Sequence, residues 1–263
     1  MLFAAGMGTR LKPLTDIMPK AMVPVNGRPL LEHTITKLCQ CGATEIVVNV
    51  HHFASQIIKY VQSHHFDCEV KISDESDELL DTGGGLKKAA VLFEEPKGLY
   101  GDIDQVEVNC HMDRTEGLVD NDPILIHNVD IFSNADLSSF YERNKENEVT
   151  LLVSERPTSR YLLFNDDNDL VGWTNVKTCE VRSPYPRLDV ASCRAYAFSG
   201  IHLFSPSVFV FMNSFPEKFP IMDFYLSVCD KVKIKADVQK DLKLLDVGKQ
   251  DTLKAAEAFL ATL

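Results

Sequence analysis

The chain has 263 residues, of which 45% are hydrophobic, and carries a formal net charge of −11 at pH 7. This length favours one large α/β domain with a sizeable core over two small domains. The acidic balance argues against a nucleic-acid-binding protein, which needs a basic face to displace counterions, so any anionic ligand must meet a local basic pocket.

The first half of the chain alternates short apolar runs with helical patterns. Strands are expected at residues 2–5, 45–50 and 69–73, and helices at residues 30–41 and from residue 54. Residues 122–132, "DPILIHNVDIF", predict another buried strand, followed by a helix over 135–145 and a strand over 149–155. The alternation predicts a Rossmann-like α/β fold, with a mostly parallel mixed sheet covered by helices on both faces.

The second half is richer in hairpins. A polar turn separates two apolar runs in "YLLFNDDNDLVGWTN", and residues 194–204 form a further strand. Ser205 and Pro206 predict a helix start, and a last helix is expected over 250–263. Residues 95–123 combine prolines, glycines and acids with little periodicity, which predicts a surface insertion that is either mobile or functional.

Cysteine usage and hydropathy bear on the compartment. Seven cysteines form an odd count, and Cys39 and Cys41 have neither the spacing nor the second half of a zinc site. Reduced thiols are therefore expected. The start shows no leader pattern, and no stretch reaches the roughly 20 apolar residues of a membrane span. We expect a cytoplasmic protein that contacts neither membrane nor nucleic acid, and its oligomeric state stays open.

Ligands of open α/β sheets bind beyond the carboxyl ends of the strands. Two glycines, a threonine and Arg10 follow the first predicted strand in "GMGTR". Glycine permits positive φ and lets backbone amides approach a phosphate, although an ordinary turn beside a solvated arginine would look the same. Lys20 stands between Pro19 and Pro24, which hold the segment extended and aim the lysine; the alternative is a solvated lysine.

The full pattern "GMGTRLKPLTDIMPKAMVPVNGRPLL" resembles the sugar-1-phosphate nucleotidyltransferases. The resemblance continues through "DTGGGLKKA", "NVD", "GWTN", "FSGIHLFSP" and "DVGKQDTLKAAE", and is greatest to the N-acetylmuramate-1-phosphate uridylyltransferase branch. It implies that a sugar 1-phosphate and a nucleoside triphosphate, UTP by first choice, give a nucleotide sugar and pyrophosphate. A sugar phosphate is already an anionic nucleophile, so catalysis reduces to positioning and neutralising two polyanions.

The resemblance also implies residue roles. Arg10 and Lys20 are the catalytic cations, and Asp130 and Asp246 hold Mg²⁺ as the cofactor. Nucleotide contacts are expected from the glycine-rich segments, at Ala5, Gly6, Gly8, Thr9, Gly83 and Gly84. Sugar-phosphate contacts are expected from the second half and the strand before Asp130, at Asn128, Arg160, Trp173, Asn175, Ser199 and Gly200. Each has a structural alternative: a helix entry for the glycines, core packing for Trp173, a surface position for Arg160.

On this reading residues 1–263 form a single domain. Residues 1–150 are its nucleotide-binding part, residues 151–245 its sugar-binding part, and residues 246–263 carry the second metal aspartate and a helix. Val129 departs from the family, which usually has glycine before the metal aspartate, and a β-branched residue there is expected to crowd the turn. His127 is interpreted as a packed or hydrogen-bonded strand residue.

Three alternatives stay open. The first is a hexose- or heptose-1-phosphate guanylyl- or thymidylyltransferase. The second, kept open by Val129, is a non-catalytic nucleotide-sugar sensor on the same fold. The third is a metal-dependent glycosyltransferase, which would leave the phosphate loop with Arg10 and Lys20 unexplained.

Overall fold

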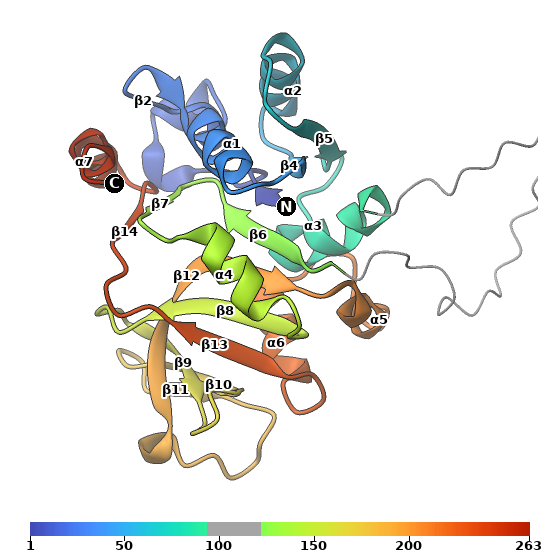
Figure 1. Cartoon of the computed structure of the whole chain (residues 1–263), viewed down its shortest axis with the longest axis vertical. Helices are drawn as coiled ribbons and strands as arrows, with labels where there is room; N and C mark the ends of the chain where they lie inside the picture. The colour runs from blue at the N-terminus through green and yellow to red at the C-terminus, as the bar shows by residue number, and fades with distance from the viewer. Residues whose placement is uncertain (94–121) are drawn as a thin grey trace, which may run out of the picture.

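A computed structural model describes residues 1–93 and 122–263 of the chain (Figure 1). The predicted insertion at 95–123 lies almost wholly outside the described residues. The described strands are β1 Leu2–Phe3, β2 Pro24–Val25, β3 Arg28–Pro29, β4 Glu45–Val50, β5 Glu69–Asp74, β6 Ile124–Asn128, β7 Ile131–Ser133, β8 Val149–Ser154, β9 Arg160–Phe164, β10 Leu170–Asn175, β11 Glu180–Arg182, β12 Arg194–Phe204, β13 Ile234–Val238 and β14 Leu244–Asp246. The α-helices are α1 Leu30–Gln40, α2 Ala54–Ser63, α3 Asp81–Ala89, α4 Leu137–Asn144, α5 Phe209–Met212, α6 Ile221–Val228 and α7 Gln250–Leu260.

One mixed sheet of ten strands runs through the molecule, in the order β11-β10-β9-β12-β6-β1-β4-β5, with β8 pairing both β12 and β13. Strands β6, β1, β4 and β5 are mutually parallel, whereas β12 runs against β6, β8 and β9. Because β8 is antiparallel to β12, it points the same way as β6. The carboxyl ends of β1, β4, β5, β6 and β8 therefore meet at one edge, where ligands of such sheets bind.

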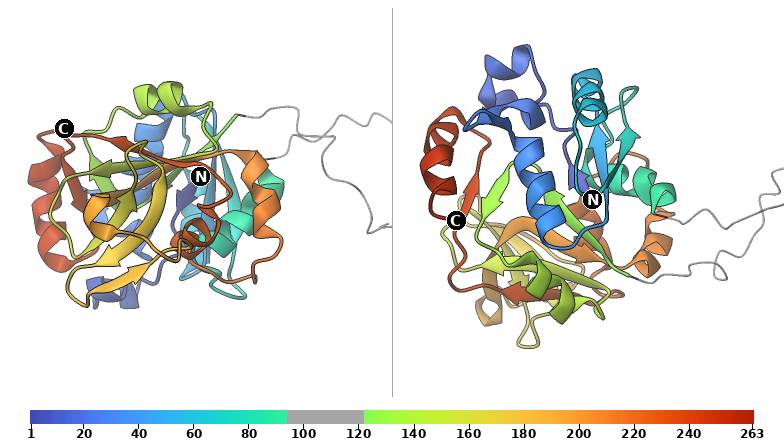
Figure 2. Two further views of the ribbon diagram at one scale, coloured as in Figure 1. Left: turned by 90° about the horizontal axis from the view of Figure 1, so that it is seen from below. Right: turned by 45° about the horizontal axis from the view of Figure 1, so that its top comes forward.

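Helices cover both faces of this sheet, as the sequence predicted (Figures 1 and 2). Helices α1, α2, α4 and α7 enclose one buried apolar cluster, which includes Leu31, Ile57 and Phe140. Helices α3 and α6 enclose a second cluster on the opposite face, which includes Leu86 and Phe224. Among the described residues, no helix combines the length and the apolar character that crossing a bilayer requires.

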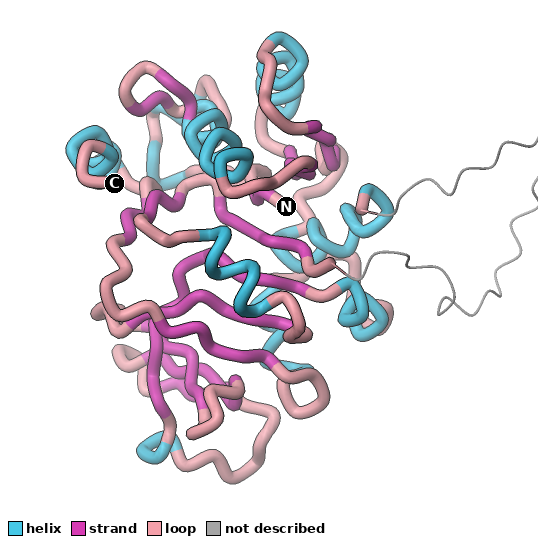
Figure 3. The backbone as a smooth tube through the Cα atoms, in the orientation of Figure 1, coloured by secondary structure: helices cyan, strands magenta, loops and turns pink. Residues whose placement is uncertain are grey.

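The predicted hairpins form the extension at the bottom of Figure 1. Strand β10 pairs antiparallel with both β9 and β11. Strand β12 joins them to the main sheet, because its residues Ala195 and Tyr196 pair with β9. The tube view in Figure 3 shows short turns between these strands and a longer loop that leads from β11 to β12. The apolar side chains Leu162, Phe164 and Leu170 belong to the same core cluster as α6, so the hairpins are packed onto the sheet.

The structure corrects several predicted boundaries. The run at 122–132 is not one strand, because β6 ends at Asn128 and β7 begins at Ile131, with a turn at Val129 and Asp130. Asp246 is the last residue of β14, a strand that the sequence analysis did not describe. Helix α6 and strand β13 were not predicted. Strand β13 extends the sheet alongside β8.

A buried histidine makes the fold sensitive to acid. His202 in β12 is 1% exposed, its ring meets the Tyr225 ring of α6 edge to face at 5.6 Å, and neither ring nitrogen has a hydrogen-bond partner among the described residues. Burial lowers the pKa of His202 from 6.5 to about 3. Below pH 6.5 the His202 side chain binds a proton in the unfolded chain but not in the folded chain. The free energy of unfolding therefore falls as the pH drops toward 3.

We therefore expect His202→Leu to weaken this pH dependence. Between about pH 7 and about pH 5, the wild type should lose about 2 kcal/mol more unfolding free energy than the variant. Urea unfolding followed by circular dichroism at both values measures this, with the exposed His65→Leu as control. Equal losses in wild type and His202→Leu would contradict the assignment.

Candidate active site

The predicted phosphate loop follows β1 at the carboxyl edge of the sheet. Ala5 is buried, whereas Gly6 and Thr9 are exposed, and a Cβ built on Gly6 would meet no atom within 4 Å. Gly8 has φ +61°, and a Cβ there would lie 2.8 Å from Thr15 Cγ2 and 3.0 Å from Lys20 Cβ. Glycine is therefore required at this position. The amides of Gly6 and Gly8 donate to no acceptor among the described residues, which suits them to an anion.

A side chain that the sequence analysis missed fixes the start of this loop. Asn49, at 3% exposure in β4, accepts a hydrogen bond from the Ala4 amide at 2.8 Å and donates to Glu75 Oε1 at 2.7 Å. Glu75 is fully buried, and its other oxygen accepts the Leu80 amide at 3.2 Å. Burial raises the pKa of Glu75 despite these donors. The pair ties the phosphate loop to the segment that leads into α3.

Lys20 and Asp130 form an ion pair at the same edge, and each side chain is only 13% exposed. Lys20 opens a short 3-10 helix after Pro19, whose extended backbone (φ −70°, ψ 153°) sets its direction. Burial alone would raise the pKa of Asp130, but the adjacent Lys20 ammonium outweighs it and holds that pKa below the ordinary value. The lysine is therefore not the solvated side chain of the alternative reading.

Asp246 reaches this place from the far end of the sequence. Strand β14 pairs antiparallel with β7, which sets Asp246 opposite Ile131, and its carboxylate lies 3.8 Å from Arg10 Nη2. A Cβ on Gly248 would come within 2.5 Å of Asp246 Oδ1 and 2.6 Å of Arg10 Nη2. Gly248 thus gives the arginine and the aspartate the space in which they meet.

The two carboxylates also contact each other. Burial raises the pKa of Asp246, and the charge of Asp130 adds to that effect. Two hard oxygen donors held together against their repulsion are a donor set that suits Mg²⁺, which proteins bind through one or two carboxylates completed by waters and substrate phosphates. The described residues hold no group of three or more His, Cys, Asp or Glu side chains arranged for a metal.

Arg10, Lys20, Asp130 and Asp246 thus form one cluster of two cations and two anions, which we call the charge cluster. Asn128, at the end of β6, adjoins it. A Cβ on Gly200 (φ +80°) would lie 2.7 Å from Asn128 Nδ2, so the amide of Asn128 packs on the bare backbone of β12.

Val129 does not crowd this turn. Its side chain is 3% exposed and belongs to the apolar cluster beneath α1. Its amide donates to Phe3 O at 3.1 Å, and its carbonyl accepts from Thr34 Oγ1 at 3.2 Å. The expected conflict is therefore absent, because the β-branched side chain points into the core. His127 is fully buried and its Nδ1 lies 2.7 Å from Asn128 O, as predicted for a packed strand residue.

The sugar-side residues predicted in the second half of the chain lie in β9, β10 and β12. Ser199 is 1% exposed and its hydroxyl donates to Leu152 O at 2.7 Å, so it supports the bulge of β12; its predicted contact with the sugar stays a prediction. Arg160 and Asn175 are opposite one another on β9 and β10. Trp173 is half-buried, with the Arg182 guanidinium 5.9 Å from its ring centroid.

Arg156 was missed by the sequence analysis. It follows β8 at the carboxyl edge, donates from Nη2 to Phe198 O at 2.8 Å, and has a buried Nε with no partner among the described residues. Arg156 therefore brings a positive charge next to the bulge of β12 that carries Gly200. The signal was the cluster of two arginines in "ERPTSR".

Gly83 and Gly84 stand at the start of α3, where both amides donate to Phe219 O, at 2.8 and 3.2 Å. A Cβ on Gly84 would lie 2.0 Å from Glu217 O. These glycines are thus required for close packing of α3 on the segment before α6. Both amides therefore have an acceptor within the protein, and the predicted nucleotide contacts of Gly83 and Gly84 stay predictions.

The chain is similar to known nucleotidyltransferases. The profile of the family "Nucleotidyl transferase" matches residues 1–262. The N-acetylmuramate alpha-1-phosphate uridylyltransferase of Caulobacter vibrioides is 38% identical over 109 residues, which cover 40% of this chain and 45% of that protein. A mannose-1-phosphate guanyltransferase of Pichia angusta is 25% identical over 231 residues, 84% of this chain and 55% of that protein. The matches thus span about half the length of these relatives.

Solved structures share the fold. A putative glucose-1-phosphate thymidylyltransferase from Bacillus anthracis superposes with a TM-score of 0.74 at 16% identity, covering 100% of this chain and 94% of that one. At such identity the likeness extends to the arrangement of strands and helices and not to the ligand contacts. It bears out the predicted α/β fold with its mixed central sheet.

Proposed function

The chain belongs to the nucleotidyl transferase family, and on this premise we propose that it transfers a nucleotidyl group from a nucleoside triphosphate to a sugar 1-phosphate. One observation carries the proposal: the charge cluster stands beside the open amides of the phosphate loop. Two cations for phosphate oxygens and two carboxylates for a metal are what the joining of two polyanions requires.

The reaction needs no side-chain nucleophile and no general base. An oxygen of the sugar phosphate attacks the α-phosphorus, and the bond from that phosphorus to the oxygen that bridges to the β-phosphate breaks. Pyrophosphate leaves with its electron pair, so no proton is moved. Bound Mg²⁺ would supply further positive charge to the triphosphate, held by Asp130 and Asp246.

The chain's own residues divide the remaining work. Without substrate, Lys20 pairs with Asp130 and Arg10 lies beside Asp246. If Asp130 and Asp246 held a metal, Arg10 and Lys20 would be available to phosphate oxygens, with the Gly6 and Gly8 amides as further donors. Asn128, Arg160, Trp173, Asn175 and Gly200 make up the proposed sugar side, to which Arg156 is added.

UTP and N-acetylmuramic acid 1-phosphate are the proposed substrates. The similarity to the Caulobacter uridylyltransferase supports this choice. The similarity to a mannose-1-phosphate guanyltransferase keeps the guanylyl alternative in place. The cytoplasmic location expected from the sequence remains a prediction.

Base selectivity provides the test. In a panel of five nucleoside triphosphates against several sugar 1-phosphates, we expect UTP to be preferred by about 10-fold or more, because a wrong base leaves pocket hydrogen bonds unpaired. Pyrophosphate release measures the rates. A clear preference for GTP with a mannose or heptose phosphate would move the protein to the guanylyl branch. Nucleotide binding by calorimetry without pyrophosphate from any pair would favour the sensor.

A further inference from the structure

Two cysteine sulfurs meet far from the charge cluster. Cys39 is near the end of α1 and Cys68 directly precedes β5, and their Sγ atoms are 2.7 Å apart. Both residues are half-buried. This separation is within about 0.7 Å of the roughly 2.05 Å of a disulfide bond. The two thiols therefore stand close enough to form a bond with only a small side-chain movement.

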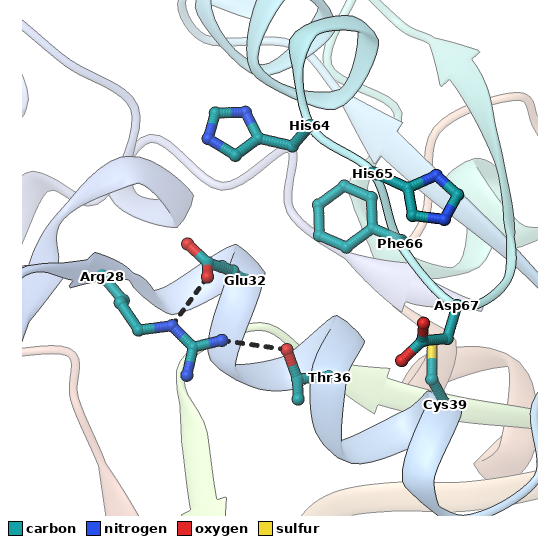
Figure 4. A pocket seen from close by; sticks show the side chains of 8 residues that line it. All are labelled: Arg28, Glu32, Thr36, Cys39, His64, His65, Phe66 and Asp67. Atoms are coloured by element: carbon teal, nitrogen blue, oxygen red, sulfur yellow. Dashed lines mark hydrogen bonds and ion pairs between the residues drawn. The ribbon is translucent and has the colours of Figure 1, made fainter.

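Cys39 is also open to small molecules. It lines a pocket of about 140 Å³ whose other walls include Arg28, His64, His65 and Asp67. Figure 4 shows the Cys39 sulfur at one end of this pocket and the Arg28–Glu32 pair at the other end. Cys68 is not among the lining residues. The pocket thus gives an oxidant a path to one sulfur of the pair.

We infer that Cys39 and Cys68 are a redox modification site, at which a peroxide closes a reversible disulfide. The Cys39 thiolate attacks a peroxide oxygen, which breaks the O–O bond and gives a sulfenic acid and, for hydrogen peroxide, water. The Cys68 sulfur then attacks Cys39, forming the S–S bond and releasing a second water. Two thiols are oxidised and one peroxide is reduced, so the step balances; a dithiol reductant reverses it.

The order of attack follows from the surroundings. Burial, together with the hydrogen bond shared with Cys39, raises the pKa of the Cys68 thiol to about 12. Cys39 lines the pocket and Cys68 does not, so a peroxide reaches Cys39 first. Cys68 is the resolving partner.

The bond would join α1 to β5. Helix α1 carries Thr34, whose hydroxyl donates to the Val129 carbonyl beside Asp130. Oxidation therefore stiffens the helix that supports the aspartate turn, and it shortens the loop available to the unfolded chain. We expect the oxidised protein to melt roughly 5–10 °C higher than the reduced protein.

The test is peptide mapping of the full-length protein. After brief treatment with hydrogen peroxide and blocking of free thiols with N-ethylmaleimide, we expect a cross-linked peptide containing Cys39 and Cys68. It should disappear after dithiothreitol, and the rise in melting temperature should disappear with it. Cys39→Ser and Cys68→Ser should form no such peptide, whereas the neighbouring Cys41→Ser should still form it.

The inference would be overturned if both cysteines of the wild type were still free after peroxide and were therefore alkylated by N-ethylmaleimide. So would Cys39 over-oxidised to a sulfinic acid without a cross-link, or a bond from Cys39 to another cysteine. Mapping of the wild type decides these outcomes even if a serine variant fails to fold. The result is independent of the proposed reaction, because no nucleotide is used.

Discussion

Replacing Asp246 by asparagine is expected to lower turnover by about 10²-fold or more while leaving the folded chain at least as stable as before. The variant loses a charge proposed to hold the metal. It also loses the repulsion between Asp246 and Asp130, which together with burial raises the pKa of Asp246. A loss of activity without a loss of stability would show that Asp246 serves the reaction and does not stabilise the fold.

Asp130→Asn should lower turnover equally but differ in stability. Lys20 would then keep its charge, at 13% exposure, after losing its ion-pair partner, with only its interaction with Asp246 remaining. Breaking such a nearly buried pair costs about 3 kcal/mol. The contrast between the two aspartates, one neutral to stability and one costly, follows from the geometry of the charge cluster.

Pyrophosphate release with and without Mg²⁺ measures the activity, and urea unfolding measures the stability. Asp166→Asn is a matched control, because Asp166 pairs with Arg194 on the hairpin surface at 91% side-chain exposure. Its activity and stability should be unchanged. Full turnover of Asp246→Asn, or of the wild type in excess chelator, would remove the metal assignment.

Lys20→Met is expected to slow the chemical step by about 10²-fold, with a smaller loss of nucleotide affinity. Methionine keeps the length of the side chain and removes its charge. The charge is needed most when the α-phosphoryl group is between its two partners, because negative charge is then being redistributed over the phosphate oxygens. Single-turnover rates, measured apart from nucleotide binding, separate the two effects.

A lysine in the same segment provides the control. Lys12 forms an exposed pair with Asp16 at 2.9 Å, so Lys12→Met should retain the wild-type single-turnover rate. The double variant Lys20→Met/Asp130→Asn should recover stability, because neither charge is left alone, yet remain inactive. An unaltered single-turnover rate in Lys20→Met would show that the lysine serves only the ion pair.

The sequence was informative where function demands several residues at fixed spacing. The loop with Gly6 and Gly8, the aimed Lys20 and the two aspartates were all proposed from motifs, and the structure brings the charged ones together. Their roles in catalysis stay predictions. The alternation of elements also predicted the fold class, because strands buried on both faces show as continuous apolar runs.

The features of the site that the sequence did not predict depend on tertiary contacts. Asn49 and Glu75 are single polar residues within or beside strands. Only the fold shows that their hydrogen bonds hold the start of the phosphate loop. The sequence also did not show that a shift in the register of β12 turns the Ser199 hydroxyl toward Leu152 O. Val129 reads as strand by propensity, yet the chain turns there to bring Asp130 to Lys20.

The pairing of β14 with β7 has a consequence for the newborn chain. Asp246 is translated long after the phosphate loop and Asp130, at about 5–20 residues per second. Until β14 clears the ribosome and finds β7, the emerging polypeptide holds one carboxylate, no partner for Arg10, and half of the proposed metal site. A nascent chain that stops before β14 is therefore expected to turn over no nucleotide, because half of the proposed metal site has not yet been made.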